Sequence, residues 1–441
     1  MYDLTSDCGE GTQRQLITPS VRAETRASNI QTVLITHLHP DRMFMCSLDV
    51  LGLVPMMFSL MGPSSSVPEN ETRLEIFGPL GLRALVRSTL TLCYAALQGK
   101  FVIHELLWPS QPEYPHDPPS GKAFISFCES DATLPAGTER ILPLLPPHGN
   151  ELIGRNIRLD EGTHTWTDIA RVADTGVTIS AAPVTHRAPT LGYVFSEAPS
   201  ASRSVMPEEL DALDRNREAL LEQGIRNPRM LLSRLLRQRE SLHLPDGTVL
   251  EPPLLDRPGR KVTVLGDTSD ATAGLTFGGM LELAHGSDLL VHECTYAPLL
   301  AHGDANVLAG FLLPPEKATS RALERGHSVP SIVGDFAARI GAGQLVINHF
   351  SARVGAPRTI NTDAVTSPAQ LIQDENYVES LRFLAVVQEY ERQVTEAWHS
   401  KLHDIGSHVT TPAALESIYN TRAVAAFDGL TVHIPPRDSH V

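Results

Sequence analysis

Short runs of apolar and β-branched residues alternate with stretches of helical spacing along the chain. Such runs are typical of strands buried in a parallel sheet, and they lie at 33–35, 177–184, 262–265, 289–291 and 345–347. Apolar positions spaced for a helix occur over 82–97 and over 332–340. Pro330 near the start of the second helix and Gly341 after its end support that helix. Strands and helices in alternation predict an α/β fold.

Prolines and glycines divide this pattern into segments. The stretch 109–119 is rich in proline, which excludes a regular helix and a central strand, so we expect a loop or insertion there. Helical patterns cover 207–222, continue after Pro228, and return as a long polar helix over 369–402. The expected organisation is one domain over 1–441 with three insertions, a Pro-rich one at 108–170, an arm at 195–260 and a helical one at 361–410.

The composition is that of an ordinary soluble globular protein, with 42% apolar and 20% charged residues. The net charge of −15 argues weakly against nonspecific nucleic-acid binding, although a local basic patch can act against the total. The chain contains no apolar run long enough for a transmembrane helix, so no membrane association is expected. Five scattered cysteines without a Cys-x-x-Cys pair, and a start without a secretion or transit signal, favour a reducing intracellular compartment.

The strongest chemical signal is Thr36-His37-Leu38-His39-Pro40-Asp41, which directly follows the predicted strand 33–35. Two alternating histidines and a carboxylate at a strand end can all point beyond the edge of the sheet. Imidazole and carboxylate groups are zinc ligands in catalytic sites. In a chain with 18 histidines, however, this spacing alone can arise by chance.

Four further predicted strands end in candidate ligands or catalytic groups. These ends are Thr185-His186, Gly266-Asp267-Thr268, His292-Glu293 and Asn348-His349. Because open α/β sheets place their sites at the carboxyl ends of strands, the combination predicts a metal site. Each residue also has an ordinary alternative, since Asp267 suits a turn, His292 a core, Glu293 a salt bridge and His327 a helix cap.

Several motifs follow one another in order. They are Asp7-Cys8-Gly9-Glu10-Gly11-Thr12-Gln13, His37-Leu38-His39-Pro40-Asp41, Gly266-Asp267-Thr268, His292-Glu293-Cys294-Thr295, His327-Ser328, His349-Phe350-Ser351-Ala352-Arg353 and Phe427-Asp428-Gly429-Leu430. In this combination the chain resembles ribonuclease Z, the tRNA 3′-processing endonuclease branch of the metallo-β-lactamase superfamily. The resemblance covers nearly the whole chain and is interrupted by insertions.

The resemblance implies a metallo-β-lactamase-like αββα sandwich that holds one or two zinc ions, with manganese as an alternative metal. The implied metal ligands are His37, His39, Asp41, His186, Asp267 and His349. By that resemblance, His37, His39 and His186 would hold one ion. Asp267 would bridge to the second ion, and Asp41 with His349 would complete the second site. Two metal ions of this kind activate water for attack on a phosphodiester.

The resemblance also implies which residues act in catalysis. Asp41 belongs to this set, and His327, supported by Glu293, would donate a proton to the departing 3′ oxygen. Ser351 and Arg353, which follow His349, are expected near the scissile phosphate.

One residue departs from the family pattern in a way that affects the second metal. Where the family has a further histidine ligand after the motif aspartate, this chain has Arg42. A guanidinium has no lone pair for a cation, so the second site has one nitrogen ligand fewer. Three outcomes are open: a weakly bound metal that still acts, Arg42 pairing with the substrate phosphate, or an inactive protein. We expect reduced or altered activity.

The start of the chain also departs from the pattern. Met1 lies six residues before Asp7, where the family has a further strand and a glycine-containing loop. We therefore expect the fold to lack the family's first strands.

The family grips tRNA with an arm inserted between the positions of His186 and Asp267. The corresponding segment 195–260 contains several arginines, of which Arg229, Arg234 and Arg237 are expected to contact tRNA phosphates. A solvated helix face is the alternative for these charges. Structured RNA is recognised mainly by shape and backbone, so a basic arm remote from the metal centre suits that substrate.

The reading that joins these observations is a metal-dependent endoribonuclease that removes the 3′ trailer from precursor tRNA. Homodimerisation is expected, because the family often dimerises. An inactive RNA-binding scaffold on the same fold is one alternative, favoured by Arg42. A different hydrolase of the superfamily, acting on small esters or thioesters, is the other.

Overall fold

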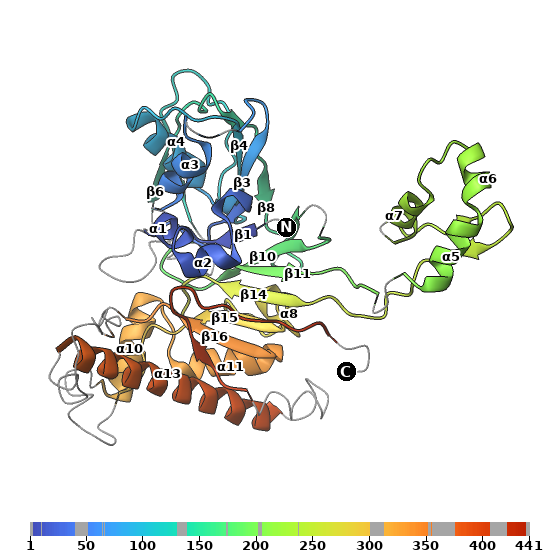
Figure 1. Ribbon diagram of the computed structural model, residues 1–441. Helices are drawn as coiled ribbons and strands as arrows, with labels where there is room; N and C mark the ends of the chain where they lie inside the picture. The colour runs from blue at the N-terminus through green and yellow to red at the C-terminus, as the bar shows by residue number, and fades with distance from the viewer. Residues whose placement is uncertain are drawn as a thin grey trace. The chain divides into compact units, whose positions relative to one another are not determined.

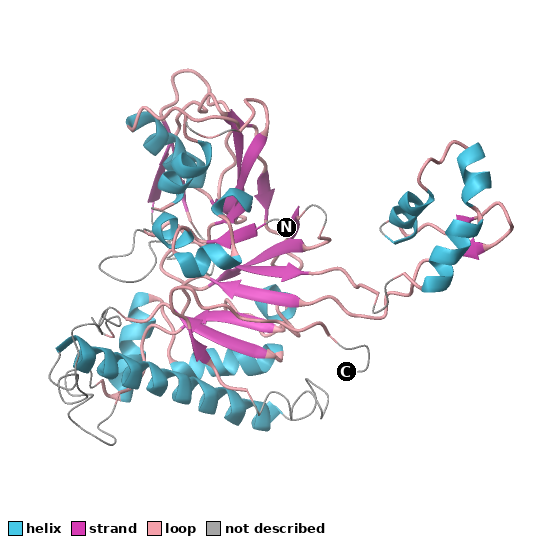
Figure 2. Ribbon diagram, in the orientation of Figure 1, coloured by secondary structure: helices cyan, strands magenta, loops and turns pink. Residues whose placement is uncertain are grey.

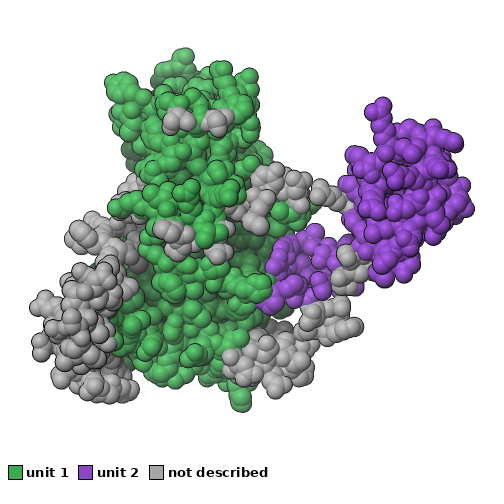
Figure 3. Space-filling view, viewed as in Figure 1, with its two compact units in different colours: residues 1–196, 261–434 green, residues 197–260, 435–441 purple. Residues whose placement is uncertain are grey.

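The structure is a computed structural model, and it describes residues 3–9, 11–39, 52–63, 65, 67–129, 139–172, 175–201, 205–236, 238–299, 313–351, 354, 375–405 and 421–437. The chain forms two compact units. Unit 1 comprises residues 1–196 and 261–434, and unit 2 comprises residues 197–260 and 435–441 (Figure 3).

The first sheet of unit 1 contains parallel strands. They are β1 (Asp3–Ser6), β2 (Ile30–Leu34), β3 (Thr72–Pro79), β4 (Lys100–Leu107), β7 (Glu151–Leu152) and β8 (Asn156–Arg158). Their order is β1-β2-β3-β4-β7, with β8 also pairing with β4. Parallel strands need cover on both faces, and β3 meets this requirement because Ile76 and Phe77 are both buried on opposite faces.

The second sheet of unit 1 is mixed. Its strands are β9 (Trp166–Arg171), β10 (Thr178–Val184), β11 (Thr190–Ser196), β14 (Lys261–Leu265), β15 (Leu289–Glu293), β16 (Gln344–Asn348) and β17 (Val424–Ala425). The order is β17-β16-β15-β14-β11-β10-β9, antiparallel from β9 to β14 and parallel from β14 to β17. The strands predicted from the five apolar runs are confirmed, because each run falls largely on β2, β10, β14, β15 or β16.

Helices flank both sheets (Figures 1 and 2). In the first half of unit 1 they are α1 (Thr12–Leu16), α2 (Pro19–Glu24), η1 (Ala27–Asn29), α3 (Leu53–Met61) and α4 (Leu82–Leu92). In the second half they are α8 (Gly279–Leu283), α10 (Pro315–Arg325), α11 (Pro330–Ile340) and α13 (Glu375–Ile405). Among the helices of the described ranges, none has the length and apolar character needed to cross a bilayer.

Three clusters of buried side chains define the order of the layers. One packs α3 and α4 against the first sheet, for example Val86 against Ile76. A second joins the two sheets face to face and contains Phe77 of β3 and Tyr193 of β11. The third packs α8, α11 and α13 against the second sheet. The layers are therefore helix, sheet, sheet and helix, which confirms the predicted αββα sandwich.

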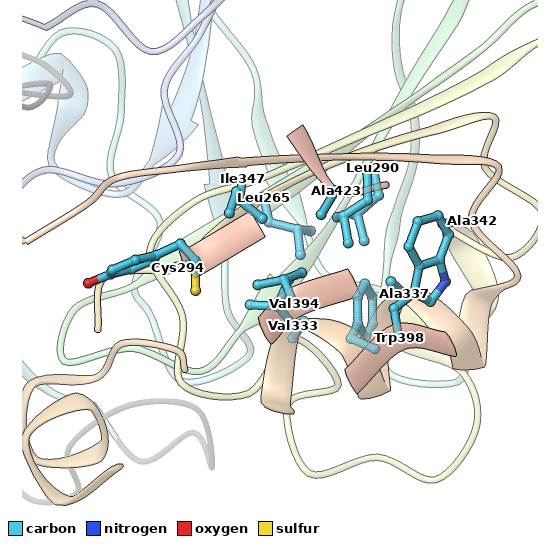
Figure 4. Close-up of a cluster of buried hydrophobic side chains, with 14 of the residues drawn as sticks. Leu265, Leu290, Cys294, Val333, Ala337, Ala342, Ile347, Val394, Trp398 and Ala423 are labelled. Carbon is cyan, nitrogen blue, oxygen red and sulfur yellow. The ribbon is translucent and has the colours of Figure 1, made fainter. Parts of the chain in front are cut away.

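Helices α11 and α13 lie side by side below the second sheet (Figure 1). Figure 4 shows Leu290 and Ile347 of the sheet facing Val333 of α11 and Trp398 of α13. The two helices approach closely at Gly334, where an added Cβ would lie 2.5 Å from the backbone nitrogen of Trp398. Only glycine at position 334 allows α13 to pack this closely against α11.

Helix ends follow the predicted signals in part. Helix α11 has Pro330 at its first turn and Gly341 in the left-handed conformation after its end, as predicted. The helix predicted over 82–97 instead ends at Leu92, because Tyr94 takes a positive φ of 50° and Ala95 N donates back to Leu90 O. The long polar helix is α13, and positions 369–374 of its predicted range lie outside the described residues.

The stretch 109–119 contains neither helix nor strand, as its prolines predicted. Within the segment 108–170 a hairpin of β5 (Phe124–Cys128) and β6 (Glu139–Pro143) forms a separate two-stranded sheet. Tyr114 of the Pro-rich stretch is buried and belongs to a small cluster with Leu107 and Leu144.

Unit 2 has its own small core. Its elements are α5 (Pro207–Arg215), α6 (Arg217–Glu222), η2 (Pro228–Met230), α7 (Leu231–Leu236), β12 (Leu242–His243) and β13 (Val249–Leu250). Leu213, Leu220 and Leu235 are buried together in this core. The helix predicted over 207–222 is divided at Asn216, whose side chain donates to Ala212 O and accepts from Asp246 N.

Candidate metal centre

Three histidines from two strand ends converge in unit 1. His37 and His39 follow β2, and His186 follows β10. Their ring centroids lie 5.2, 5.4 and 5.0 Å apart, and one nitrogen of each ring lies within 4.8 Å of the others. We call His37, His39 and His186 the histidine cluster. Three imidazoles that share so small a space form a donor set typical of zinc.

The backbone determines which nitrogen of His186 can bind a metal. His186 Nδ1 lies 2.6 Å from Gly326 O, and because a carbonyl oxygen only accepts, Nδ1 carries the proton. Nε2 is therefore the nitrogen with the lone pair, and it lies 3.1 Å from His39 Nδ1. Burial lowers the pKa of His186 to about 3, so the ring is neutral near pH 7 and suited to coordination. An added Cβ at Gly326 would lie 2.7 Å from His186 Nδ1, so this contact requires glycine.

A carboxylate orients His37 through a threonine. Asp7 follows β1 and accepts from Thr36 N at 2.7 Å and from Thr36 Oγ1 at 3.0 Å. The same hydroxyl lies 3.0 Å from His37 Nδ1. When Asp7 is ionised, the hydroxyl donates to it and accepts from His37 Nδ1, which leaves His37 Nε2 with the lone pair. Burial raises the pKa of Asp7 to about 7, so its charge is sensitive to its surroundings.

Asp267 lies between the histidine cluster and a second group of ligand atoms. It follows β14, and its Oδ2 lies 3.6 Å from His37 Nε2 and 3.4 Å from His349 Nε2. Asp267, His327 and His349 place one ligand atom each within 4.8 Å of the others. His349 follows β16 with a φ of 56°, a left-handed conformation that is uncommon for histidine and concentrates at functional sites.

His327 differs from the other histidines in its hydrogen bonding. Its Nδ1 lies 3.1 Å from Glu293 Oε1 and 3.8 Å from Asp267 Oδ2. Because the nearer carboxylate accepts the Nδ1 proton, that nitrogen has no lone pair for a metal. Its Nε2 remains available, as in His349, and both histidines belong to the second group by distance.

Glu293 is a buried hub at the end of β15. Its Oε1 accepts from Thr268 N, Ser328 N and His327 Nδ1 at 3.0 to 3.1 Å. Its Oε2 accepts from Thr295 N at 2.9 Å and from Thr295 Oγ1 at 2.8 Å. Burial opposes ionisation, but the hydrogen bond and charge of His327 and the charge of His349 outweigh it and lower the pKa of the Glu293 carboxyl. Glu293 is therefore an anion that holds the surrounding loops together.

The donor set of the centre fits zinc. The histidine cluster offers three imidazole nitrogens, and Asp267 adds a carboxylate beside His37. From the described residues, Asp267, His327 and His349 offer ligand atoms to a second ion, and Asp267 and His349 are the two that were predicted as ligands. Residues 40–51, which include Asp41 and Arg42, lie outside the described residues.

The described residues that were predicted to contact the substrate do not all lie at the metal centre. Ser351 is half-buried, and its backbone nitrogen donates to Thr295 O at 3.0 Å beside the centre. Arg353 and Arg237 lie outside the described residues. In unit 2, Arg229 is paired with Asp214 and Arg234 with Glu240, at 3.1 and 2.7 Å.

These ion pairs leave Arg229 and Arg234 accessible. The side chains of Arg229 and Arg234 are 62% and 53% exposed, and exposed ion pairs contribute little free energy. Residues 197–260 contain ten arginines and eleven acidic residues, so the segment is nearly neutral as a whole. Any attraction for phosphate there must come from the local arrangement of its arginines rather than from its net charge.

Sequence reasoning missed the residues that orient the ligands. Thr36, Thr268, Thr295 and Gly326 received no role, and Asp7 was noted only as part of a motif. Thr36 and Thr295 each stand one or two residues from a candidate ligand or from Glu293, which was the available signal. Their partners, however, come from distant strands, so the roles required the fold.

Comparisons with known proteins agree with this geometry. No family model matches the chain. Zinc phosphodiesterase ELAC protein 1 of Mus musculus is 29% identical over 350 residues, which cover 79% of this chain and 78% of the relative. Ribonuclease BN of Cronobacter sakazakii is 28% identical over 353 residues, covering 79% of each. Ribonuclease Z of Parasynechococcus marenigrum is 25% identical over 369 residues, covering 83% and 82%.

Among solved structures, the crystal structure of the short form of human tRNase Z matches with a TM-score of 0.41 and 23% identity, covering 79% of this chain and 82% of that one. Over about four fifths of its length, the chain is therefore similar in sequence to zinc phosphodiesterase ELAC protein 1 and to ribonuclease Z.

Proposed function

We propose that this protein is a zinc-dependent phosphodiester hydrolase that removes the 3′ trailer from precursor tRNA. The observation that carries the proposal is the convergence of His37, His39 and His186 beside Asp267 at strand ends that are distant in sequence. The relatives named zinc phosphodiesterase and ribonuclease Z support the same chemistry and the RNA substrate.

In this proposal the histidine cluster holds the first ion. Asp267, His349 and Asp41 would hold a second ion. The short distances from Asp267 Oδ2 to His37 Nε2 and His349 Nε2 support a role for Asp267 beside both groups of ligands. Bound zinc supplies Lewis acidity to a phosphoryl oxygen and lowers the pKa of water, which is the chemistry that phosphodiester hydrolysis needs.

Two side chains of the protein, His327 and Glu293, then provide the proton for the leaving oxygen. His327 donates from Nε2 to the departing 3′ oxygen, because its Nδ1 is engaged with Glu293. The Glu293 anion stabilises the charged imidazolium before transfer and keeps the ring oriented, so its effect runs through His327. Asp41, His327 and Glu293 are the proposed catalytic set.

Substrate contacts extend to the arm. Arg229, Arg234 and Arg237 bind phosphates of the tRNA body, and Ser351 and Arg353 lie near the scissile phosphate. The exposure of Arg229 and Arg234 supports their part in this assignment. Arg42 in place of a histidine predicts a weaker second metal and reduced activity.

Metal stoichiometry on the purified chain is the first test. We expect one tightly bound zinc and a second, weaker one, with the tight site lost in His37→Ala. His285→Ala is the matched control, since His285 is exposed and lies outside the centre. Unchanged zinc content in His37→Ala would refute the site, and two equally tight ions would refute the effect assigned to Arg42.

Activity assays separate the proposed enzyme from its alternatives. Cleavage of a precursor tRNA with zinc or manganese supports the nuclease, whereas RNA binding without cleavage supports the inactive scaffold that Arg42 favours. Hydrolysis of a thioester in preference to bis(p-nitrophenyl) phosphate would indicate another hydrolase. We further propose a homodimer, which sedimentation of the purified chain tests.

A further inference from the structure

Thr295 occupies a central place between the hub carboxylate and a candidate ligand. It is buried and stands two residues after Glu293. Its hydroxyl lies 2.8 Å from Glu293 Oε2 and 2.8 Å from His349 Nδ1. The side chain is therefore shared between a carboxylate and an imidazole.

The direction of these two hydrogen bonds follows from the donors around Glu293. Thr268 N, Ser328 N and Thr295 N all point at its two oxygens, and a backbone N–H cannot accept. The carboxylate must therefore act as an acceptor throughout, so the single hydroxyl proton of Thr295 is donated to Oε2. The remaining interaction of the hydroxyl, with His349 Nδ1, is then accepted from an Nδ1–H group.

We infer that Thr295 is a positioning residue that fixes the tautomer and orientation of His349, so that Nε2 presents its lone pair to the metal. This inference rests on the proposed function in that it takes His349 as a metal ligand. The Nε2 atom lies 3.4 Å from Asp267 Oδ2, on the side where the ion would be shared. Through this hydroxyl, Glu293 therefore orients a second histidine, His349, in addition to His327.

The backbone of Thr295 is held firmly enough for this task. Its amide donates to Glu293, and its carbonyl accepts from Ser351 N at 3.0 Å and from Tyr390 Oη of α13 at 3.2 Å. The hydroxyl therefore has little freedom to leave His349. Helix α13 contributes to the metal centre through this contact.

The same device occurs at the other ligand that faces Asp267. Thr36 Oγ1 lies 3.0 Å from Asp7 Oδ2 and 3.0 Å from His37 Nδ1. In both cases a threonine hydroxyl separates a buried carboxylate from Nδ1 of a ligand whose Nε2 faces Asp267 Oδ2. The repetition at two sequence-distant positions supports a role in orienting the imidazole.

Removing the hydroxyl should weaken metal binding rather than abolish the fold. Groups that orient a metal ligand through its second nitrogen typically change affinity by about 10- to 100-fold. We expect Thr295→Val to lower the affinity of one zinc by about that factor and Thr295→Ser, which keeps the hydroxyl, to restore it. Thr263→Val is the matched control, because Thr263 is also buried and bonds Ser287 Oγ at 2.7 Å on β14.

Zinc affinity would be measured by competition with a chromophoric chelator, with thermal unfolding recorded for each variant. Weakening in Thr295→Val with recovery in Thr295→Ser supports the inference. Wild-type affinity in Thr295→Val, or equal weakening in Thr295→Ser and Thr263→Val, overturns it.

A second measurement keeps the inference testable even if the chain binds no zinc or the valine variant does not fold. Long-range proton–nitrogen NMR of metal-free wild-type protein, isotope-labelled in histidine, reports which ring nitrogen carries the proton. The His349 signal is assigned by its loss in His349→Asn. A proton on Nδ1 is expected, and a proton on Nε2 alone would overturn the inference. Absence of zinc binding with an Nδ1 proton would refute the proposed function but leave the role of Thr295 intact.

Discussion

Replacement of Glu293 by glutamine tests the hub that joins the strand ends of the metal centre. The two side chains have the same shape, but glutamine replaces one acceptor oxygen by an NH₂ group. Each oxygen of Glu293 meets at least one backbone N–H, Thr295 N at Oε2 and both Thr268 N and Ser328 N at Oε1. The amide NH₂ therefore faces a donor that cannot turn, whichever way the side chain is flipped.

The cost follows from this mismatch. A buried N–H that loses its acceptor costs about 1–3 kcal/mol, and the remaining hydrogen bonds lose the extra strength that a charged partner provides. Removing a buried charge could offset this loss, but the lowered pKa of Glu293 shows that its surroundings favour the anion over the neutral acid. We therefore expect Glu293→Gln to lower the free energy of unfolding by about 2–4 kcal/mol.

Urea unfolding of the metal-free protein, with chelator present at pH 7.5, measures this change without a contribution from metal binding. Glu282→Gln on α8 is the control, because Glu282 is exposed and a change there should stay within about 0.5 kcal/mol. If Glu293→Gln unfolds at the same urea concentration as the wild type and the control, the hydrogen bonds assigned to Glu293 are wrong.

Three further predictions concern other parts of the molecule. Gly334→Ala should destabilise the protein by about 1–2 kcal/mol in thermal unfolding, because the clash 2.5 Å from Trp398 N outweighs the better helix propensity of alanine; a higher melting temperature would contradict the packing of α11 on α13. In metal-free protein the raised pKa of Asp7, about 7, means that the folded state holds a proton that the unfolded state releases above pH 4. The free energy of unfolding should therefore rise by about 2–3 kcal/mol, relative to Asp7→Asn, as the pH falls from 8 to 5. Parallel pH profiles of the two proteins would contradict the raised pKa of Asp7. Replacing Arg234 and Arg237 by glutamine should weaken tRNA binding and lower its salt dependence by up to about two phosphate contacts, with unchanged zinc content; equal affinity would remove the arm from the binding surface.

Much of the architecture is readable from local pattern. The apolar runs that became β10, β15 and β16 are buried on both faces, and burial of that kind leaves a continuous apolar signature. Helix α11 was readable as well, because Pro330 and Gly341 act on the backbone locally. The end of α4 was not readable, since the left-handed Tyr94 has no local signal such as glycine.

The candidate ligands were also readable, because a side chain at the carboxyl end of a strand is placed by the strand itself. His37, His186, Asp267 and His349 all follow strands in the sequence and meet in the structure. Their chemical types, imidazole and carboxylate, then indicate the metal.

The orientation of those ligands was decided only by the tertiary structure. Asp7 reaches His37 through Thr36, and Glu293 reaches His349 through Thr295. A hydrogen bond requires its donor and acceptor to be placed to within a few tenths of an ångström, and here these atoms come from elements that lie far apart in the chain. The sequence alone therefore determined which groups could bind a metal and at which strand ends they stand, whereas tertiary contacts between neighbouring strands and loops decided which nitrogen of His37, His186 and His349 is left to bind it.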